Sequence, residues 1–142
     1  MGAYYMNEAM FDLAEAGFVD RTVTYLEGTS PGGADVVLLV ERQPFPEGKS
    51  LRQVTAQHVN DARKRLRGYS VIFQRDVEVA GLPAIDLGVR WREESGTPVY
   101  TRQTHLAVGG AWLIVAGEVP LAEREFCDAY VDRALGSLQL RE

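Results

Sequence analysis

Apolar and polar residues alternate along the first third of the chain in a pattern that predicts β-strands. Apolar side chains recur at every second position in residues 11–14 and 21–26, so Val23 and Tyr25 share one face of a strand. Residues 36–40 are apolar without interruption, which is typical of a strand that is covered on both faces. We therefore expect three strands before the first helix.

Two segments have the three-to-four-residue spacing of amphipathic helices. Ser50 suits an N-cap, and the pattern after it predicts a helix that runs to about Arg67 and stops at Gly68. Pro120 suits the first turn of a second helix near the end of the chain. The apolar stripes consist of Leu51, Val54, His58, Ala62 and Leu66 in the first helix, and of Cys127, Val131, Ala134, Leu135 and Leu138 in the second.

Between the two predicted helices, apolar and polar residues again alternate with a period of two. Turn-forming residues, the first of them at 80–83, separate four alternating segments between residues 70 and 117, which predicts a four-stranded antiparallel meander. Without repeats or linkers, residues 1–142 read as a single α+β domain with a sheet of about six to seven strands and two main helices.

The strands carry more apolar residues than one covered face requires. In residues 36–40 and 112–116 the odd- and the even-numbered positions are both apolar, so both faces of the sheet are hydrophobic there. Two helices of about sixteen residues can shield one face of such a sheet but not both faces completely. The remaining apolar surface is either a dimer interface or a groove for a ligand.

The composition is that of a folded, acidic chain. Of the 142 residues 46% are hydrophobic, and 20 Asp and Glu against 15 Lys and Arg give a net charge of −5. This balance removes the attraction that nucleic acid or an anionic membrane requires. The first residues lack the features of a secretory signal, and the longest uncharged stretch, residues 103–117, is too short to span a bilayer. We expect a cytoplasmic protein without nucleic acid or membrane insertion.

Candidate catalytic groups are few. His58 and His105 are the only histidines and Cys127 is the only cysteine, and none has the spacing of a metal site or of a nucleophile with its base. We therefore expect no metal, no cofactor and no reaction, while a small enzyme that uses these three residues stays an alternative. Asp86 is expected among the solvated charges of a strand pair.

The chain resembles the DcrB-related proteins, in particular the Eag (effector-associated) chaperones of type VI secretion systems. Residues 4–25, YYMNEAMFDLAEAGFVDRTVTY, are similar to the opening two strands of that family. The likeness continues in LRGY at 66–69, TRQ at 101–103, AWLIV at 111–115 and the closing helix. It covers essentially the whole chain, although its motifs are strand and helix patterns rather than a chemical signature.

This resemblance implies a curved, Mog1/PsbP-like sheet and a homodimer. Its apolar concave surface would hold the N-terminal transmembrane helices of a secreted effector, such as an Rhs or PAAR-containing toxin, before secretion. A DcrB-like binding module without a role in secretion is the alternative within the family.

The resemblance also implies which residues line the groove that binds this client. Val23 and Tyr25, Leu66 and Ile114 correspond to its apolar positions, and Gln103 and His58 to polar contacts with the client helix. His58 departs from the glutamine of the relatives, and histidine titrates near neutral pH. Leu66 and Ile114 could instead be core, and Val23 and Tyr25 could face a dimer partner.

Overall fold

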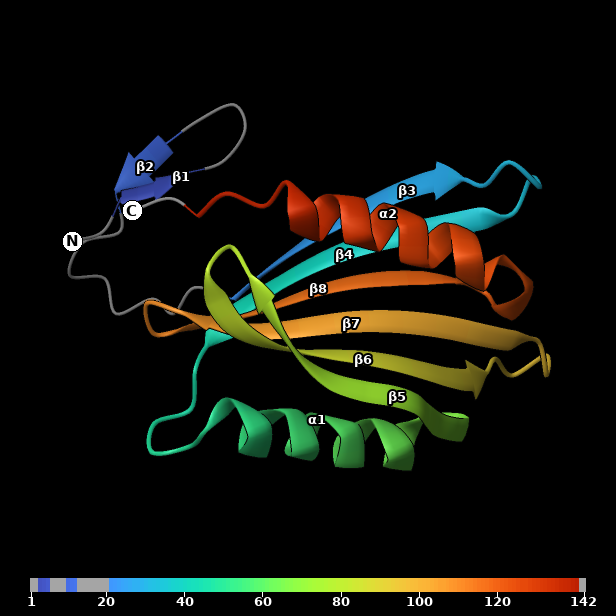
Figure 1. The fold of residues 1–142 in the computed structure, drawn as a ribbon, viewed down its shortest axis with the longest axis horizontal. Helices are drawn as coiled ribbons and strands as arrows, with labels where there is room; N and C mark the ends of the chain where they lie inside the picture. Colours follow the sequence, from blue (N-terminus) through green and yellow to red (C-terminus); the bar gives the residue numbers. More distant parts are fainter. Residues whose placement is uncertain (1–2, 6–9, 13–20, 141–142) are drawn as a thin grey trace.

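The computed structural model describes residues 3–5, 10–12 and 21–140, and its main feature is a curved antiparallel sheet (Figure 1). Two short strands near the N-terminus pair only with each other among the residues described. The elements are β1 (Ala3–Tyr5), β2 (Met10–Asp12), β3 (Thr22–Thr29), β4 (Asp35–Pro44), α1 (Leu51–Arg65), β5 (Arg67–Val79), β6 (Leu82–Arg92), β7 (Pro98–Val108), β8 (Ala111–Pro120), a 3-10 turn (Leu121–Glu123) and α2 (Arg124–Gly136).

The six-stranded sheet has the order β3-β4-β8-β7-β6-β5, with every neighbouring pair antiparallel. Strands β5 to β8 form the predicted meander. The β3–β4 hairpin joins it along β8, because α1 carries the chain from β4 to the opposite edge. The prediction of a single α+β domain with a six- to seven-stranded antiparallel sheet and two helices is confirmed.

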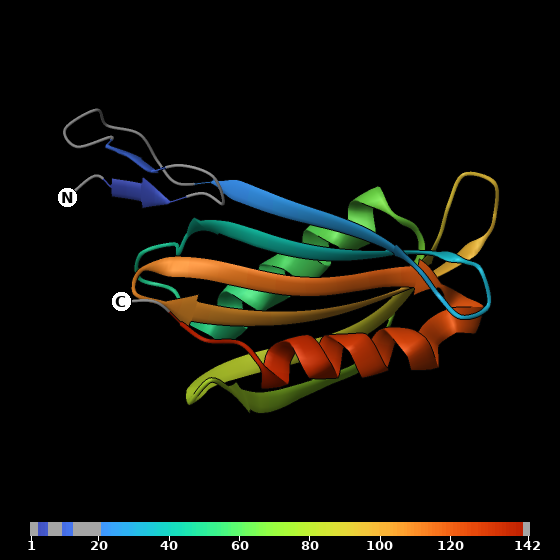
Figure 2. The ribbon, with the colours of Figure 1, turned by 90° about the horizontal axis from the view of Figure 1, so that it is seen from above.

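The two helices lie on opposite faces of this sheet. The ring of His105 in β7 contacts that of His58 in α1, whereas Tyr100 in the same strand donates a hydrogen bond to Asp128 in α2. Residues 100 and 105 differ in parity and therefore point to opposite faces. Figure 2 agrees, with α1 behind the sheet and α2 in front of it. We name these the α1-side face and the α2-side face.

The α2-side face is closed by tight packing. A buried cluster of Val36, Tyr100, Val119, Cys127 and Val131 joins α2 to the sheet. A Cβ atom on Gly117 would lie 2.6 Å from Val131 Cγ2 and 2.8 Å from Cys127 Sγ. Glycine at this position therefore allows α2 to approach β8 closely.

A buried ion network lies on the same face. Asp86 is 1% exposed, and Arg102, which is 3% exposed, donates two hydrogen bonds to its carboxylate at 3.1 and 3.0 Å. Arg102 also reaches Asp132 of α2 at 2.7 Å, while Arg75 and Thr104 complete the contacts of Asp86. The expectation that Asp86 is solvated is wrong, because its alternate position in β6 points under α2.

The predicted helix boundaries need small corrections. Ser50 caps α1 in a capping box with Gln53, as its sequence position indicates. The helix ends at Arg65 rather than Arg67, because Leu66 is already extended, and Gly68, with φ of +61°, lies within β5 instead of ending the helix. Pro120 ends β8, so α2 begins later than predicted.

The predicted strands are mostly longer than their apolar runs. The turn expected at 80–83 consists of Ala80 and Gly81 alone, both with positive φ, as a tight two-residue hairpin requires. Of the first predicted strand, residues 11 and 12 belong to β2, whereas residues 13 and 14 lie outside the described residues. Among the helices described, none has the length and apolar character needed to cross a membrane.

Candidate functional site

The α1-side face is covered at one end and open at the other. Helix α1 packs mainly on β5, β6 and β7, so the part of this face formed by β4 and β3 extends beyond it. At the open end Val23 is 62% exposed and Tyr25 55% exposed. In the β3–β4 register Tyr25 lies opposite Leu39 and Val23 opposite Glu41, both half-buried. Val23, Tyr25 and Leu39 thus form an apolar row at the border of the sheet on this face, with Glu41 beside Val23.

A polar cluster lies between this row and α1. Trp112 Nε1 donates to His105 Nδ1 at 3.1 Å, and His105 Nε2 lies 2.9 Å from Gln103 Oε1. The first bond makes Nδ1 the acceptor, so the proton of the neutral ring lies on Nε2 and is donated to Gln103. The His58 ring stands edge-on to both His105 and Trp112, with centroids 4.9 and 6.0 Å away.

Both imidazoles are neutral at pH 7. Burial lowers the pKa of His105 to about 3, and the nearby His58 contributes to that shift. Burial also lowers the pKa of His58, and the positive charge of Arg65 adds to this effect, whereas Asp61 and a hydrogen bond with Gln103 oppose it. The polar cluster consequently presents dipoles rather than charges on this part of the α1-side face.

A cavity of about 320 Å³ opens beside this cluster. Its walls come from α1, from Trp112 of β8 and from the end of β4. The charged side chains of Lys49, Asp61 and Arg65 line it together with His58. It is therefore a mixed polar and aromatic recess, unlike the apolar row on β3.

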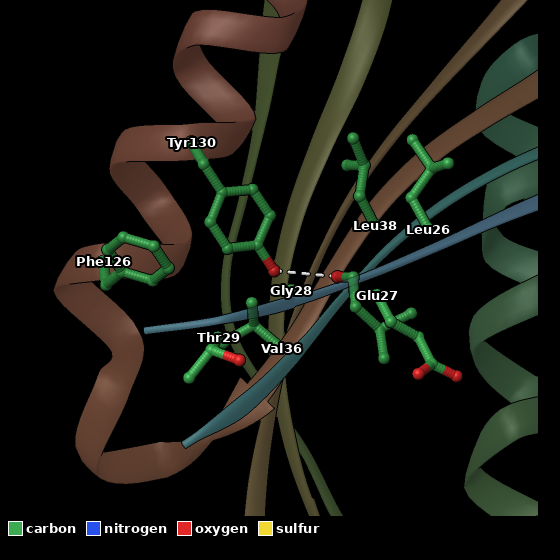
Figure 3. A pocket seen from close by; sticks show the side chains of 9 residues that line it. Leu26, Glu27, Gly28, Thr29, Val36, Leu38, Phe126 and Tyr130 are labelled. Carbon is green, nitrogen blue, oxygen red and sulfur yellow. Dashed lines mark hydrogen bonds between the residues drawn. The ribbon is translucent and has the colours of Figure 1, made fainter. Parts of the chain in front are cut away.

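A smaller notch of about 200 Å³ lies on the other face of the same hairpin (Figure 3). Phe126 and Tyr130 point from α2 toward β3 and β4, where Leu26 and Leu38 line the opposite wall. Tyr130 donates its hydroxyl hydrogen to the carbonyl oxygen of Val37 at 2.8 Å, which fastens α2 to β4. Leu26 is 53% exposed at the rim of the notch.

The structure brings together some of the six predicted groove residues and separates others. His58 and Gln103 belong to the polar cluster, and Val23 and Tyr25 form the exposed row on the same face. Ile114 faces the same side opposite His105, but it is only 2% exposed and is therefore covered in this chain. Leu66 is half-buried at the junction of α1 and β5, at the edge of the sheet opposite β3.

Two contributors to the α1-side face were missed in the sequence. Trp112 holds the tautomer of His105, and Leu39 extends the apolar row onto β4. The usable signal for Trp112 was its place two residues before Ile114, which was already assigned to the groove, because residues two apart in a strand share a face. Leu39 carried no such signal, because no residue of the apolar run 36–40 was assigned to the groove.

The three alternative catalytic residues do not converge. Cys127 is fully buried on the side of α2 that faces the sheet, and burial raises the pKa of its thiol to about 11. His58 and His105 lie on the α1-side face, so neither can act as a base for this thiol. Among the described residues, no group of three or more His, Cys, Asp or Glu side chains is arranged to hold a metal ion.

Comparison with solved structures identifies proteins that share the fold. PA94 from Pseudomonas aeruginosa, a protein of unknown function, is 20% identical with a TM-score of 0.88, covering 100% of this chain and 98% of its own. LpqN of Mycobacterium tuberculosis, involved in cell envelope biogenesis, is 11% identical with a TM-score of 0.55 over 84% of this chain and 80% of its own. CyanoP, the cyanobacterial PsbP of Synechocystis sp. PCC 6803, is 16% identical with a TM-score of 0.54 over 82% and 79%. Because all three sequence identities are low, these similarities support only the PsbP-like fold and no function.

Sequence comparison identifies the family. None of the curated proteins matches this chain. The profile of the DcrB family, in contrast, matches residues 8–135, which is most of the sequence. The chain therefore belongs to the DcrB family.

Proposed function

We propose that this DcrB-family protein is a chaperone of the Eag type. It would shield the N-terminal transmembrane helices of a type VI secretion effector and help to load that effector, an Rhs or PAAR-containing toxin, onto the secretion apparatus. The observation that carries the proposal is the exposed apolar row of Val23 and Tyr25 at the open end of the α1-side face.

A transmembrane client helix needs an apolar surface that removes its own apolar side chains from water, and the row on β3 and β4 offers one. A transmembrane helix has about 20 mostly apolar residues, and each Å² of apolar surface that leaves water contributes about 25 cal/mol. A client helix that lies on β3 and β4, with α1 as one wall, would bury its own apolar side chains together with Val23 and Tyr25. The sheet face would thus substitute for lipid until secretion.

The polar cluster suits the small or polar positions of a client helix. Side-chain hydrogen bonds between helices are worth about 1 kcal/mol in apolar surroundings, enough to favour one alignment over another. His58 and Gln103 lie within the cluster that faces the groove, and both are neutral at pH 7. A neutral donor or acceptor avoids the larger desolvation cost of a charge when the client docks.

The proposal includes no reaction and no cofactor. The separation of Cys127 from both histidines by the sheet supports this part, as does the pKa of about 11 of its thiol. We further propose that the protein acts in the cytoplasm as a homodimer, without binding nucleic acid and without inserting into a membrane. The net charge of −5 supports the exclusion of nucleic acid.

Co-expression with the N-terminal apolar segment of the effector encoded beside this protein tests the proposal. We expect the segment to be insoluble alone, to co-purify with the tagged chaperone and to give a defined stoichiometry in native mass spectrometry. Tyr25→Asp should reduce the recovered client at least about tenfold, because the new carboxylate must be desolvated when the helix docks.

Leu26→Asp is the matched control for this experiment. It makes the same apolar-to-acidic change at a similarly exposed position of β3, but on the α2-side face. We expect it to retain the client. Equal loss in both variants, or a client that is soluble without the chaperone, would contradict the proposal that the α1-side face binds it.

The cavity beside His58 favours a second candidate function, that of a DcrB-like module that binds a small ligand without a role in secretion. Its volume of about 320 Å³ lies at the lower end of small-molecule sites. Lys49, Asp61 and Arg65 would favour a polar, charged ligand there. A His58→Gln variant that keeps the client but loses a ligand detected in the purified protein would support this second function.

A further inference from the structure

Three exposed arginines gather at one end of the sheet without a carboxylate to pair with. Arg63 lies in the last turn of α1, Arg67 begins β5 and Arg92 ends β6. Figures 1 and 2 show these segments at the end of the sheet away from β1 and β2. Within the described residues none of the three forms an ion pair. Other arginines of the chain do form ion pairs, namely Arg52, Arg75, Arg102 and Arg124. We name Arg63, Arg67 and Arg92 the arginine cluster.

The strand register places two of these cations against each other. Arg67 lies directly opposite Arg92 in the β5–β6 ladder, where like charges destabilise the pairing of strands. Backbone carbonyls hold both side chains. Arg67 Nη1 donates to the carbonyl oxygen of Glu94 at 3.2 Å, and Arg92 Nη1 donates to that of Gly96 at 2.9 Å. These acceptors orient the guanidinium groups without neutralising them, and most of their five N–H donors stay unused within the described residues.

Tyr69 adds a donor without an acceptor at the same place. Its hydroxyl oxygen is buried and has no hydrogen-bond partner among the described residues. The guanidinium carbon of Arg63 lies 6.0 Å from the centre of its ring. Arg92 packs beside it, because a Cβ atom on Gly68 would lie 3.6 Å from Arg92 Cδ. A buried donor without an acceptor destabilises a folded chain, so the hydroxyl and the three cations all lack an anionic oxygen.

Ordinary structural roles explain only part of the arginine cluster. A cation in the last turn of a helix complements the helix dipole, which accounts for Arg63. A charge on an edge strand discourages pairing with another sheet, which accounts for Arg67 in β5. Neither role accounts for Arg92, which lies in the second strand of the sheet and opposite another arginine.

We propose that the arginine cluster and Tyr69 bind an acidic segment of a partner protein. Residues opposite each other in antiparallel strands have Cα atoms about 4.5–5.5 Å apart, so Arg67 and Arg92 can hold two closely spaced carboxylates, each by paired N–H donors. An anion that draws the exposed Arg63 side chain off the ring would also reach the Tyr69 hydroxyl.

The charge of the whole chain favours a peptide over other anions. With a net charge of −5, the protein repels a nucleic acid or an anionic membrane that extends beyond the arginine cluster, whereas a short acidic segment contacts the cluster alone. The cluster lies at the β5 edge of the sheet and the exposed row at the β3 edge. The inference therefore does not rest on the proposed client binding.

Fluorescence anisotropy with a labelled hexaglutamate peptide at low salt tests the inference on the full chain. We expect saturable binding of hexaglutamate and none of hexaglutamine. Arg67→Gln and Arg92→Gln should each weaken the binding about tenfold, because each removes a charge-assisted contact. Tyr69→Phe should weaken it about threefold without lowering the midpoint of urea denaturation, since the hydroxyl has no partner to lose in the unbound protein. A lower midpoint would overturn the assignment of Tyr69 to the site.

Arg133→Gln is the matched control. It removes the same charge from an exposed arginine of α2 that forms no ion pair with a described residue. We expect it to bind hexaglutamate with the affinity of the wild type. An equal loss in Arg133→Gln and Arg67→Gln would show that the attraction depends only on net charge, and the arginine cluster would not be a site.

Two further probes distinguish the peptide from other anions. Hexathymidylate and vesicles of phosphatidylglycerol present phosphates instead of carboxylates. Tighter binding of either one than of hexaglutamate would overturn the proposal of an acidic peptide, as would the absence of hexaglutamate binding at about 1 mM. Tyr25→Asp, which should lose the client, should bind hexaglutamate as the wild type does. Loss of the client in the wild type with hexaglutamate binding intact would contradict the chaperone proposal alone.

Discussion

The two faces of the sheet hold their helices by different chemistry. On the α2-side face, Arg102 and Asp86 form a buried ion pair that continues to Asp132 of α2. On the α1-side face the buried polar contacts are neutral, with His105 bonded to Gln103 and Trp112, whereas the ion pair between Arg52 of α1 and Asp76 of β5 is exposed. Buried charges are costly to separate, so they suit a helix that stays in place. Neutral dipoles and apolar side chains suit a surface that a partner covers, because little hydration is lost on docking.

Removal of the cation on the α2-side face should have the largest effect. Arg102→Leu leaves Asp86 buried with only the half-exposed Arg75 as a cationic partner, and should lower the free energy of unfolding by about 3–5 kcal/mol. Urea denaturation measures this loss. Arg52→Leu is the control, since it breaks only the exposed pair with Asp76 and should cost about 0–1 kcal/mol. Similar losses in the two variants would show that the buried network does not anchor α2.

The neutral histidines of the α1-side face should make the stability of the protein depend on pH. The pKa of His105 is about 3 in the folded chain and 6.5 in the reference state, so between these values the unfolded chain binds a proton that the folded chain does not. Stability should therefore fall as the pH decreases from 6.5, by about 1 kcal/mol per pH unit for this residue. His58, whose pKa is lowered in the same direction, adds to the slope.

Urea denaturation at pH 6.5, 5.5 and 4.5 measures this dependence. His105→Gln removes the titrating group while keeping a polar side chain, and should flatten the slope relative to the wild type. A variant slope equal to that of the wild type would show that other groups produce the acid sensitivity.

Packing on the α2-side face should tolerate less added volume than the open edge. Gly117→Ala places a methyl group 2.6 Å from Val131 and should cost about 1–3 kcal/mol, because α2 must move. Gly28→Ala, on the same face in β3, meets only Val36 at 3.4 Å and should cost less than 1 kcal/mol. Thermal unfolding ranks the two variants, and an equal cost would mean that α2 adjusts freely over β8.

The exposed row should show the smallest effect on stability. Tyr25→Asp changes a side chain that is 55% exposed, so the free energy of unfolding of the monomer should change by less than about 0.5 kcal/mol. Ile114→Asp, at the buried position of the same face, should instead prevent stable folding, since its carboxylate would be buried without a partner. Circular dichroism during urea titration distinguishes the two, and only the Tyr25 variant is suitable for binding assays.

Local patterns in the sequence predicted the elements better than their assembly. The two-residue period located β5 to β8, and Ser50 located the start of α1, because both signals act between residues close in the chain. Asp86 was misplaced because its neighbours in sequence are uninformative about Arg102 and α2, which cover it only in the folded sheet. Val23 and Tyr25 are exposed because β3 is an edge strand of the sheet. The sequence did not predict this, because the alternation of side chains locates a strand but does not determine the order of the strands.

The same strand order sets the course of folding. The β3–β4 hairpin is synthesised early, yet its partner in the sheet is β8, so Val37 pairs with Glu118 after nearly the whole chain has left the ribosome. Contacts between segments so far apart in sequence form slowly, because a long loop must close first. Until β8 is made, β4 has an open edge along its apolar residues 36–40, and such an edge is prone to pair with other chains. A holdase that occupies the hairpin during synthesis should therefore raise the yield of folded protein more than it raises its equilibrium stability.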